Sequence, residues 1–387
     1  MAVACSPKGD PPAAPTVTEL KSPAAPGSGE PNLSVGSEEE LFLSWLEPEA
    51  TDEYALRFST RVDRGEWSTP QTIARGSDWF VSPADFPSLV ALPDETLAAS
   101  WFTATELETE SYDINIAFSR DKGATWTAPI SPHRDKKKRQ HGFLSLVPFG
   151  GNQLAAVWLD GKNLPEDFIG DMALMHTTIA ADGTLGPETQ LDDRVCECCL
   201  TSMTATPDGL LVVYRDRSET EIRDISMVRY ADGAWSQPEP LAKDGWEIYG
   251  CPVNGPAISS SDRNVAVAWF TAPNDQPRTS VLMSSDGGKT FGNPIRIDQG
   301  NPIGRVDVLS LPSGDAIVSW LERTESGARV RVRQIDPNGV AGAPVVVSED
   351  GALSSGVTRL ERSADGVVVA WADAEDKVRT TLINFGQ

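Results

Sequence analysis

An apolar strand that ends in an aromatic residue recurs seven times along this chain of 387 residues, at intervals of 51 to 57 residues. The aromatic residues are Trp45, Trp101, Trp158, Tyr214, Trp269, Trp320 and Trp371. Each copy follows another apolar strand and precedes a polar loop and two more strand-like segments. Four short strands in a unit of about 50 residues are typical of a β-propeller blade. The repeat predicts an all-β propeller, with seven blades favoured and six as the alternative.

The repeat also divides the chain into two regions. Residues 32–387 form a single propeller domain, whereas residues 1–31 are rich in Pro, Ala, Ser and Gly, which is typical of a flexible tether. The last repeat, from about Val357, supplies only three strands. The strand-like segment 16–20 is the candidate for the missing fourth strand, which would close the ring and remove an open sheet edge.

The first five residues end in Ala2-Val3-Ala4-Cys5. Small residues before a cysteine resemble the end of a bacterial lipoprotein signal, although the charged and apolar parts of a signal peptide are missing. The resemblance implies lipidation of Cys5 and a location in the bacterial cell envelope, on the periplasmic side or at the surface. Membrane contact would then run only through the lipid anchor. An ordinary free cysteine on a tail is the alternative.

Charge and hydropathy exclude two classes of partner. The chain has 33 Lys and Arg against 56 Asp and Glu, a formal net charge of −23. Such a charge repels phosphate backbones, so no nucleic-acid partner is expected. No run of about 18 apolar residues occurs, so no membrane-spanning helix is expected. A closed ring of this size is expected to fold as a monomer.

Two predicted turns carry a recognisable motif. Residues 119–126 (SRDKGATW) match Ser-x-Asp-x-Gly-x-Thr-Trp, and residues 284–291 (SSDGGKTF) match it with Phe for Trp. These segments resemble the Asp-box, or bacterial neuraminidase repeat, propellers, a group that includes sialidases. The resemblance implies an arginine triad, a Tyr nucleophile with a Glu partner, and an Asp acid/base. This sequence lacks the family's Phe/Tyr-Arg-Ile-Pro motif and has no Tyr in residues 250–387, so no catalytic residue is carried over.

The candidate ligand site lies where loops between the second and third strands meet links between blades. In propellers this face commonly binds ligands around the mouth of the channel, and here it favours blades three to five. The run 214–224 (YRDRSETEIRD) is either a solvated set of ion pairs or a preorganised site for an anionic or hydroxyl-rich ligand. The candidate residues are His141, Asp160, Arg194, Arg215, Asp216, Arg217, Glu221, Arg223, Asp224, Trp246, Arg305 and Asp307.

Four cysteines fall on the same face: Cys196, Cys198, Cys199 and Cys251. In an oxidising envelope, Cys198 or Cys199 is expected to bridge to Cys251. The alternatives are a soft metal site for copper or zinc held by three or four of the thiolates, and a reactive thiol.

Three functions remain open from the sequence. The leading hypothesis is an envelope-tethered module that binds a small molecule, a glycan, a metal or a protein partner at the mouth. A sialidase-like exo-glycosidase is an alternative. Another alternative is a metal- or carboxylate-dependent hydrolase or lyase that uses His141, Asp160, Asp216 and Glu221. The sequence does not decide whether the protein is an enzyme.

Overall fold

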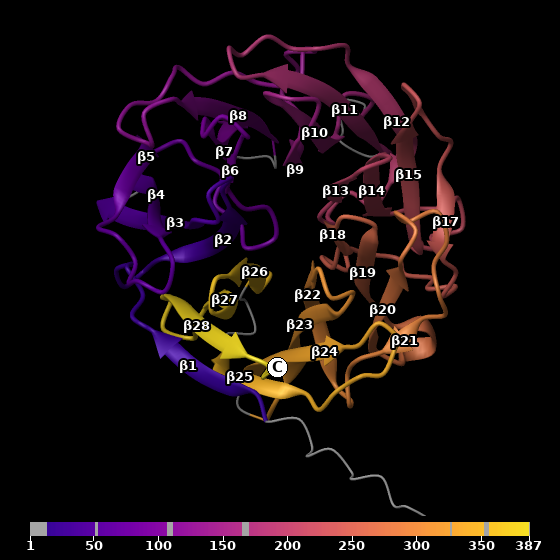
Figure 1. The fold of residues 1–387 in the computed structure, drawn as a ribbon. Coiled ribbons are helices and arrows are strands. Elements are labelled where there is room, and N and C mark those ends of the chain that lie inside the picture. Colours follow the sequence, from indigo (N-terminus) through magenta and orange to yellow (C-terminus); the bar gives the residue numbers. More distant parts are fainter. Residues whose placement is uncertain are drawn as a thin grey trace, which may run out of the picture.

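A computed structural model describes residues 14–50, 53–106, 111–164, 170–325, 327–351 and 356–386. Seven antiparallel sheets form a ring around a central axis, and the first strand of each sheet lies nearest the centre (Figure 1). The prediction of a seven-bladed, all-β propeller is confirmed, and the six-bladed alternative is wrong. The described helical structure is one short 3₁₀ turn, η1 (Pro273–Asp275). No described helix has the length and hydropathy needed to cross a membrane.

The blades follow one another along the chain. Blade one consists of β2 (Gly29–Val35), β3 (Leu41–Ala50), β4 (Glu53–Arg61) and β5 (Gln71–Gly76). Blade two consists of β6 (Ser88–Ala91), β7 (Leu97–Glu106) and β8 (Ser111–Ser119). Blade three consists of β9 (His141–Pro148), β10 (Gln153–Asp160), β11 (Met172–Ala180) and β12 (Thr189–Val195). In blade two, an isolated bridge between Ile116 and Ile130 stands in the position of a fourth strand.

Blades four to seven repeat the same antiparallel order. Blade four contains β13 (Ser202–Thr206), β14 (Gly209–Arg215), β15 (Ile225–Ala231), β16 (Ala234–Trp235) and β17 (Glu239–Ala242), and blade five contains β18 (Ala257–Ser261), β19 (Asn264–Thr271), β20 (Arg278–Ser284) and β21 (Ile295–Arg296). Blade six contains β22 (Pro302–Ser310), β23 (Ala316–Arg323), β24 (Ala328–Ile335) and β25 (Val345–Gly351). Blade seven contains β26 (Arg359–Ser363), β27 (Gly366–Ala372) and β28 (Val378–Asn384), with β1 (Thr16–Leu20) as its outer strand.

The ring closes by pairing the two ends of the chain. β1 runs antiparallel to β28, with Thr16 opposite Asn384 and Leu20 opposite Thr380. Figure 1 shows the indigo β1 beside the yellow β28. Because β1 covers the backbone groups of β28, the last blade presents no unpaired middle strand to solvent.

The second strand of each blade is buried on both faces between neighbouring blades. The side chains of Trp45, Trp158, Trp269 and Trp320 are at most 1% exposed. Burial on both faces explains why these strands are continuous apolar runs rather than alternating ones. Between blades two and three, for example, Phe102 packs in one apolar cluster with Trp158.

The turns at 119–126 and 284–291 have the same hydrogen-bond pattern. Asp121 accepts bonds from the hydroxyls of Ser119 (2.8 Å) and Thr125 (2.6 Å) and from the Thr125 amide (2.9 Å). Asp286 accepts the equivalent bonds from Ser284 (2.7 Å) and Thr290 (2.6 and 3.0 Å). These bonds lower the pKa of Asp121 to about 2. The pattern fixes the tight turn that follows the third strand in blades two and five.

Replacing Trp320 by Ala should lower the free energy of unfolding by about 3–5 kcal/mol, because the change leaves a large cavity between two blades. Trp320→Phe should lower the free energy of unfolding less than Trp269→Phe does. The indole nitrogen of Trp320 has no hydrogen-bond partner among the described residues, whereas that of Trp269 donates to Asp244 at 2.7 Å. Urea denaturation of the three variants measures the difference, and the reverse order of the two Phe variants would contradict this packing.

Candidate functional site

The predicted site residues divide between two polar clusters on one face of the ring and a layer of supporting residues. The first, which we name the histidine–aspartate cluster, contains Asp113, His133, Asp135, His141 and Asp160. The second, which we name the arginine–cysteine cluster, contains Asp171, Arg194, Cys196, Glu197, Cys198, Cys199, Arg217, Glu221, Arg223 and Cys251.

The histidine–aspartate cluster is built where blades two and three meet. His141 begins β9 and lies opposite Asp160, which ends β10. Asp113 is near the start of β8, and His133 and Asp135 belong to the link that joins the two blades. Because strand ends and the link emerge on the same face, residues 47 positions apart in the sequence converge there.

The contacts of this cluster centre on His141, whose side chain is fully buried. Its Nδ1 lies 3.2 Å from Asp113 Oδ1. Its Nε2 lies 3.2 Å from Asp135 Oδ1 and 3.6 Å from Asp160 Oδ1. The ring of His133 stacks on that of His141, with centroids 3.8 Å apart and an interplanar angle of 4°.

Burial and charge separate the protonation behaviour of the two histidines. Burial disfavours the imidazolium form of His141, but the carboxylates of Asp113, Asp160 and Asp135 outweigh burial and raise its pKa. Burial, together with the neighbouring charge of His141, lowers the pKa of His133 to about 4. The pKa values of the two imidazoles therefore move in opposite directions, and His141 takes up a proton more readily than His133.

Three members of this cluster were not among the predicted site residues: Asp113, His133 and Asp135. His133 and Asp135 lie in a blade-to-blade link, the kind of segment from which His141 was selected. Asp113 comes from the middle of a strand region, and nothing in its local sequence distinguishes it from a solvent-facing residue. A search for every His and Asp in the links would have found His133 and Asp135.

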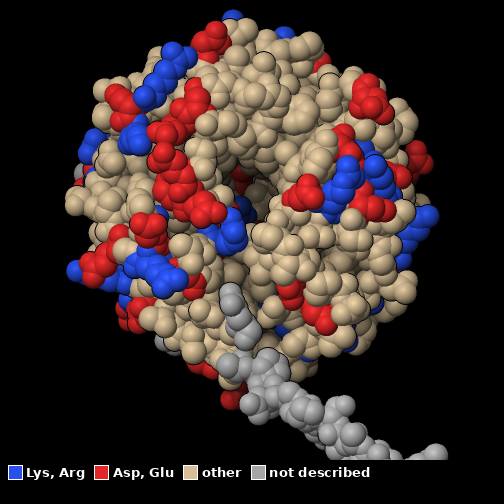
Figure 2. Space-filling view, viewed as in Figure 1, with Lys and Arg blue, Asp and Glu red and all other residues tan. Residues whose placement is uncertain are grey.

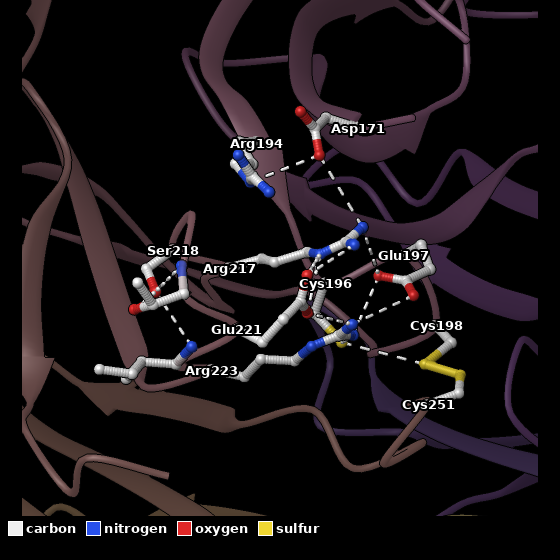
Figure 3. A network of polar contacts seen from close by, with 12 residues as sticks. Asp171, Arg194, Cys196, Glu197, Cys198, Arg217, Ser218, Glu221, Arg223 and Cys251 are labelled. Carbon is white, nitrogen blue, oxygen red and sulfur yellow. Dashed lines mark hydrogen bonds and ion pairs between the residues drawn. A yellow bond between two sulfur atoms is a disulfide. The ribbon is translucent and has the colours of Figure 1, made fainter. Parts of the chain in front are cut away.

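The arginine–cysteine cluster is a network of ion pairs at the mouth (Figure 3). Glu221 pairs with Arg217 (2.8 Å) and Arg223 (2.9 Å), and Glu197 pairs with Arg223 at 3.0 Å. Asp171 extends the network toward Arg194 at 3.4 Å. Each of the three arginine side chains therefore already has a carboxylate partner.

The cysteines form one disulfide and one pair of thiols. Cys198 is bonded to Cys251, while Cys196 and Cys199 are free and buried. The sulfur of Cys196 lies 2.6 Å from that of Cys199 and 3.9 Å from that of Cys198. While the disulfide persists, a soft metal ion would have only the two thiols as thiolate ligands, fewer than the three or four considered from the sequence.

Arginines activate one of these thiols. Burial disfavours the thiolate of Cys196, but the hydrogen bond from Cys199 and the charges of Arg215 and Arg223 outweigh it and lower the pKa to about 7. Cys199 behaves in the opposite way, because burial and its neighbour Cys196 raise its pKa. Ionisation is therefore concentrated on one sulfur of the pair.

A layer of residues beneath the mouth holds its loops in place through hydrogen bonds and ring contacts. These residues are Arg215, Asp216, Asp224 and Trp246. Arg215 donates to the carbonyls of Asn254 (2.9 Å), Arg223 (2.6 Å) and Phe270 (2.6 Å), and its guanidinium lies 4.9 Å from the Trp246 ring centroid. Asp216 accepts bonds from Arg217 N and Ser226 Oγ, and Asp224 accepts the amides of Gly245 and Trp246. These contacts leave the buried Arg215 guanidinium engaged with the backbone rather than directed toward a ligand.

Arg305 and Asp307 lie on β22 in blade six. Arg305 is close enough to interact electrostatically with Cys199 of the arginine–cysteine cluster. The Arg305 guanidinium donates to Val253 O at 2.6 Å. Asp307 accepts the amides of Val308 and Leu360, and burial raises its pKa. Their roles in the structure are to tie blade six to its two neighbours.

The centre of the ring is hollow. Figure 2 shows acidic and basic side chains around the opening. A cavity of about 290 Å³ is lined by the inner strands and includes Phe86, Arg359 and Glu361. Burial raises the pKa of Glu361 to about 7. None of the residues predicted from the sequence lines this cavity.

Comparison with known proteins identifies the fold and goes no further. No family model and no curated protein matches the sequence. An α-L-arabinanase from Penicillium chrysogenum is 14% identical, with a TM-score of 0.54 over 95% of this chain and 98% of its own. A PL25 ulvan lyase is 12% identical, with a TM-score of 0.51 over 81% of this chain and 80% of its own. NanB sialidase from Streptococcus pneumoniae is 10% identical, with a TM-score of 0.48 over 95% of this chain and 94% of its own. This similarity is too remote to support an argument.

Cys251→Ser should lower the free energy of unfolding by about 2–4 kcal/mol, because it opens a disulfide whose cysteines are 53 residues apart. Peptide mapping of the non-reduced protein should recover Cys198 linked to Cys251. Under reducing conditions the variant and the original protein should be equally stable, which serves as the control. A Cys199–Cys251 link would contradict the pairing described here.

Proposed function

We propose that this protein is a glycan-cleaving enzyme, a hydrolase or a lyase, whose reacting groups belong to the histidine–aspartate cluster. One observation carries the proposal: two stacked imidazoles and three carboxylates converge on His141 at the ligand-binding face of the propeller. The pKa values of His133, His141 and Asp160 are shifted, and such a concentration of ionisable groups is typical of sites that move protons. Cleavage of a glycosidic bond requires that a proton reach the leaving oxygen.

The cluster reaches solvent through two of its carboxylates. The side chains of Asp113 and Asp135 are 34% and 18% exposed, whereas His141 and Asp160 lie behind them. We therefore place substrate against Asp113 and Asp135. His141 and Asp160 would hold these two carboxylates in place from beneath.

The two clusters adjoin, which favours an extended ligand. Gln140, directly before His141, donates from Nε2 to the carbonyl of Glu197 at 3.2 Å. A chain of sugars over the histidine–aspartate cluster would thus extend onto Glu197 and Arg217, whose charged groups bond well to hydroxyls. The exposed ring of Tyr249 offers an apolar face in the adjoining link.

The same fold is found in an arabinanase and a polysaccharide lyase, which supports a glycan substrate without deciding the reaction. Recognition of a sialic acid carboxylate by three arginines receives less support. Arg217 and Arg223 are paired with glutamates, and Arg215 is bonded to backbone carbonyls. We therefore favour the broader hydrolase or lyase class over an exo-sialidase.

We also propose that the enzyme works as a monomer tethered to the bacterial cell envelope through a lipid on Cys5. Cys5 lies outside the described residues, and the proposal rests on its sequence context alone. The disulfide between Cys198 and Cys251 is compatible with an oxidising compartment.

The test is cleavage of three oligosaccharide classes by the full chain: arabinose-containing, sialylated and uronate-containing. Mass spectrometry distinguishes hydrolysis, which adds water to the products, from elimination, which leaves an unsaturated uronate. His141→Asn should lower the rate by about 10²–10⁴-fold, the usual effect of losing acid–base catalysis, because His141 is the residue that all three carboxylates contact. Asp113→Asn is the second variant, because this partly exposed residue is the safer one to replace in the fold.

Asp182→Asn is the matched control, since Asp182 is an exposed carboxylate of blade three bonded only to the Thr184 segment. Its rate should equal that of the unchanged protein. Saturable glycan binding with no cleavage would overturn the enzymatic proposal and favour a binding module at the mouth. If the protein neither binds nor cleaves any of the three oligosaccharide classes, the glycan assignment is overturned.

A further inference from the structure

We propose that Asp135, His141 and Asp160 bind a divalent transition-metal ion, Zn²⁺ or Mn²⁺, through Asp135 Oδ1, His141 Nε2 and Asp160 Oδ1. Asp113 would act as a positioning residue for His141. This inference goes beyond the proposed function, because the binding of the ion can be measured without any substrate.

The charge of the cluster requires a cation. Asp113, Asp135 and Asp160 have ion pairs only with imidazoles, and no described lysine or arginine pairs with any of them. Three carboxylates therefore face two imidazoles and no lysine or arginine among the described residues. Carboxylates gathered this closely repel one another unless a cation lies among them.

Several buried polar atoms of the cluster have no well-oriented hydrogen bond. Buried atoms without one include both ring nitrogens of His133 and of His141, Asp113 Oδ1 and Asp135 Oδ2. Buried polar atoms in native proteins are nearly always satisfied, and a group of them at one place indicates an ion or water. His141 decides between the two, because its fully buried ring aims Nε2 between two carboxylates.

The spacing of the donor atoms fits a coordination sphere. Ligand atoms about 2.0–2.2 Å from one zinc ion, at angles near 90–110°, lie roughly 3.0–3.5 Å apart. His141 Nε2 is 3.2 Å from Asp135 Oδ1 and 3.6 Å from Asp160 Oδ1, and all three atoms lie within 4.8 Å of one another. These distances need only a small contraction around an ion.

The second shell fits as well. Asp113 Oδ1 lies 3.2 Å from Nδ1 of His141, on the far side of the ring from Asp135 and Asp160. A carboxylate that takes the Nδ1 proton leaves Nε2 free as the ligand atom, an arrangement common among metal-binding histidines. Asp160 is held in turn by the Trp158 indole (2.7 Å) and the Lys162 amide (2.8 Å).

The ligand set also indicates the class of ion. An imidazole with two carboxylates suits zinc or manganese better than calcium or magnesium, which prefer oxygen ligands alone. Partial exposure of Asp135 leaves one side of the site open to water or to a ligand oxygen. An ion with an open position can bind and polarise such an oxygen.

The test is titration of the chelator-treated full chain with Mn²⁺ alone, followed by electron paramagnetic resonance, with Zn²⁺ in parallel by calorimetry. One saturable Mn²⁺ site per chain is expected. Asp135→Asn should abolish it, and Asp113→Asn should weaken it by about 10–100-fold, the usual effect of losing a second-shell carboxylate. Both residues are partly exposed, so the variants should fold, and circular dichroism checks this.

Two controls locate the ion. Asp182→Asn should bind Mn²⁺ as tightly as the unchanged protein does. A Cys196→Ser, Cys199→Ser double variant should also keep the site, because manganese disfavours thiolate ligands. No saturable site, or a site unaffected by both Asp135→Asn and Asp113→Asn, would overturn the inference.

The same experiment separates this inference from the proposed function. An ion bound as described, with no cleavage of any glycan, would leave the inference standing and overturn the function. If the protein cleaves a glycan but binds no ion, the proposed function stands and the metal inference is overturned.

Discussion

Closure of the ring by β1 and β28 is the constraint on which the rest of the molecule depends. Each blade buries both of its faces against neighbours, so no blade is stable at an open end. The strand from the N-terminal region completes the last blade, and the seven interfaces then support one another. Because the inner strands are held at a fixed distance around the axis, the links between blades converge at one mouth.

Both polar clusters follow from this geometry. The histidine–aspartate cluster takes residues from blades two and three and from their link, and the arginine–cysteine cluster takes residues from blades three to five. The first has more carboxylates than basic groups, whereas the carboxylates and guanidinium groups of the second pair with one another. The unbalanced cluster is therefore the better candidate for chemistry, and the balanced one for shaping the mouth.

Much of the site was predictable, and the reasons for the misses are physical. His141, Asp160 and the run from Arg215 to Asp224 were selected because they follow or precede strands on one face. The repeat could not show that Arg215 points into the protein or that Arg305 and Asp307 bond to the backbone of neighbouring segments. It could not pair the cysteines either, because Cys198 and Cys199 are adjacent and both were candidates for Cys251. The choice depends on which side chain the turn directs outward.

The sequence by itself determined the architecture, because a strand buried on both faces must be apolar throughout and must recur once per blade. It also determined which segments form the mouth, since the order of strands assigns each loop to a face. Only the tertiary structure decided which polar residues meet. Asp113, Asp135 and His141 come together because two blades pack at a fixed angle and a link folds between them. Contacts of this kind depend on side-chain direction across an interface, which no local pattern in the chain encodes.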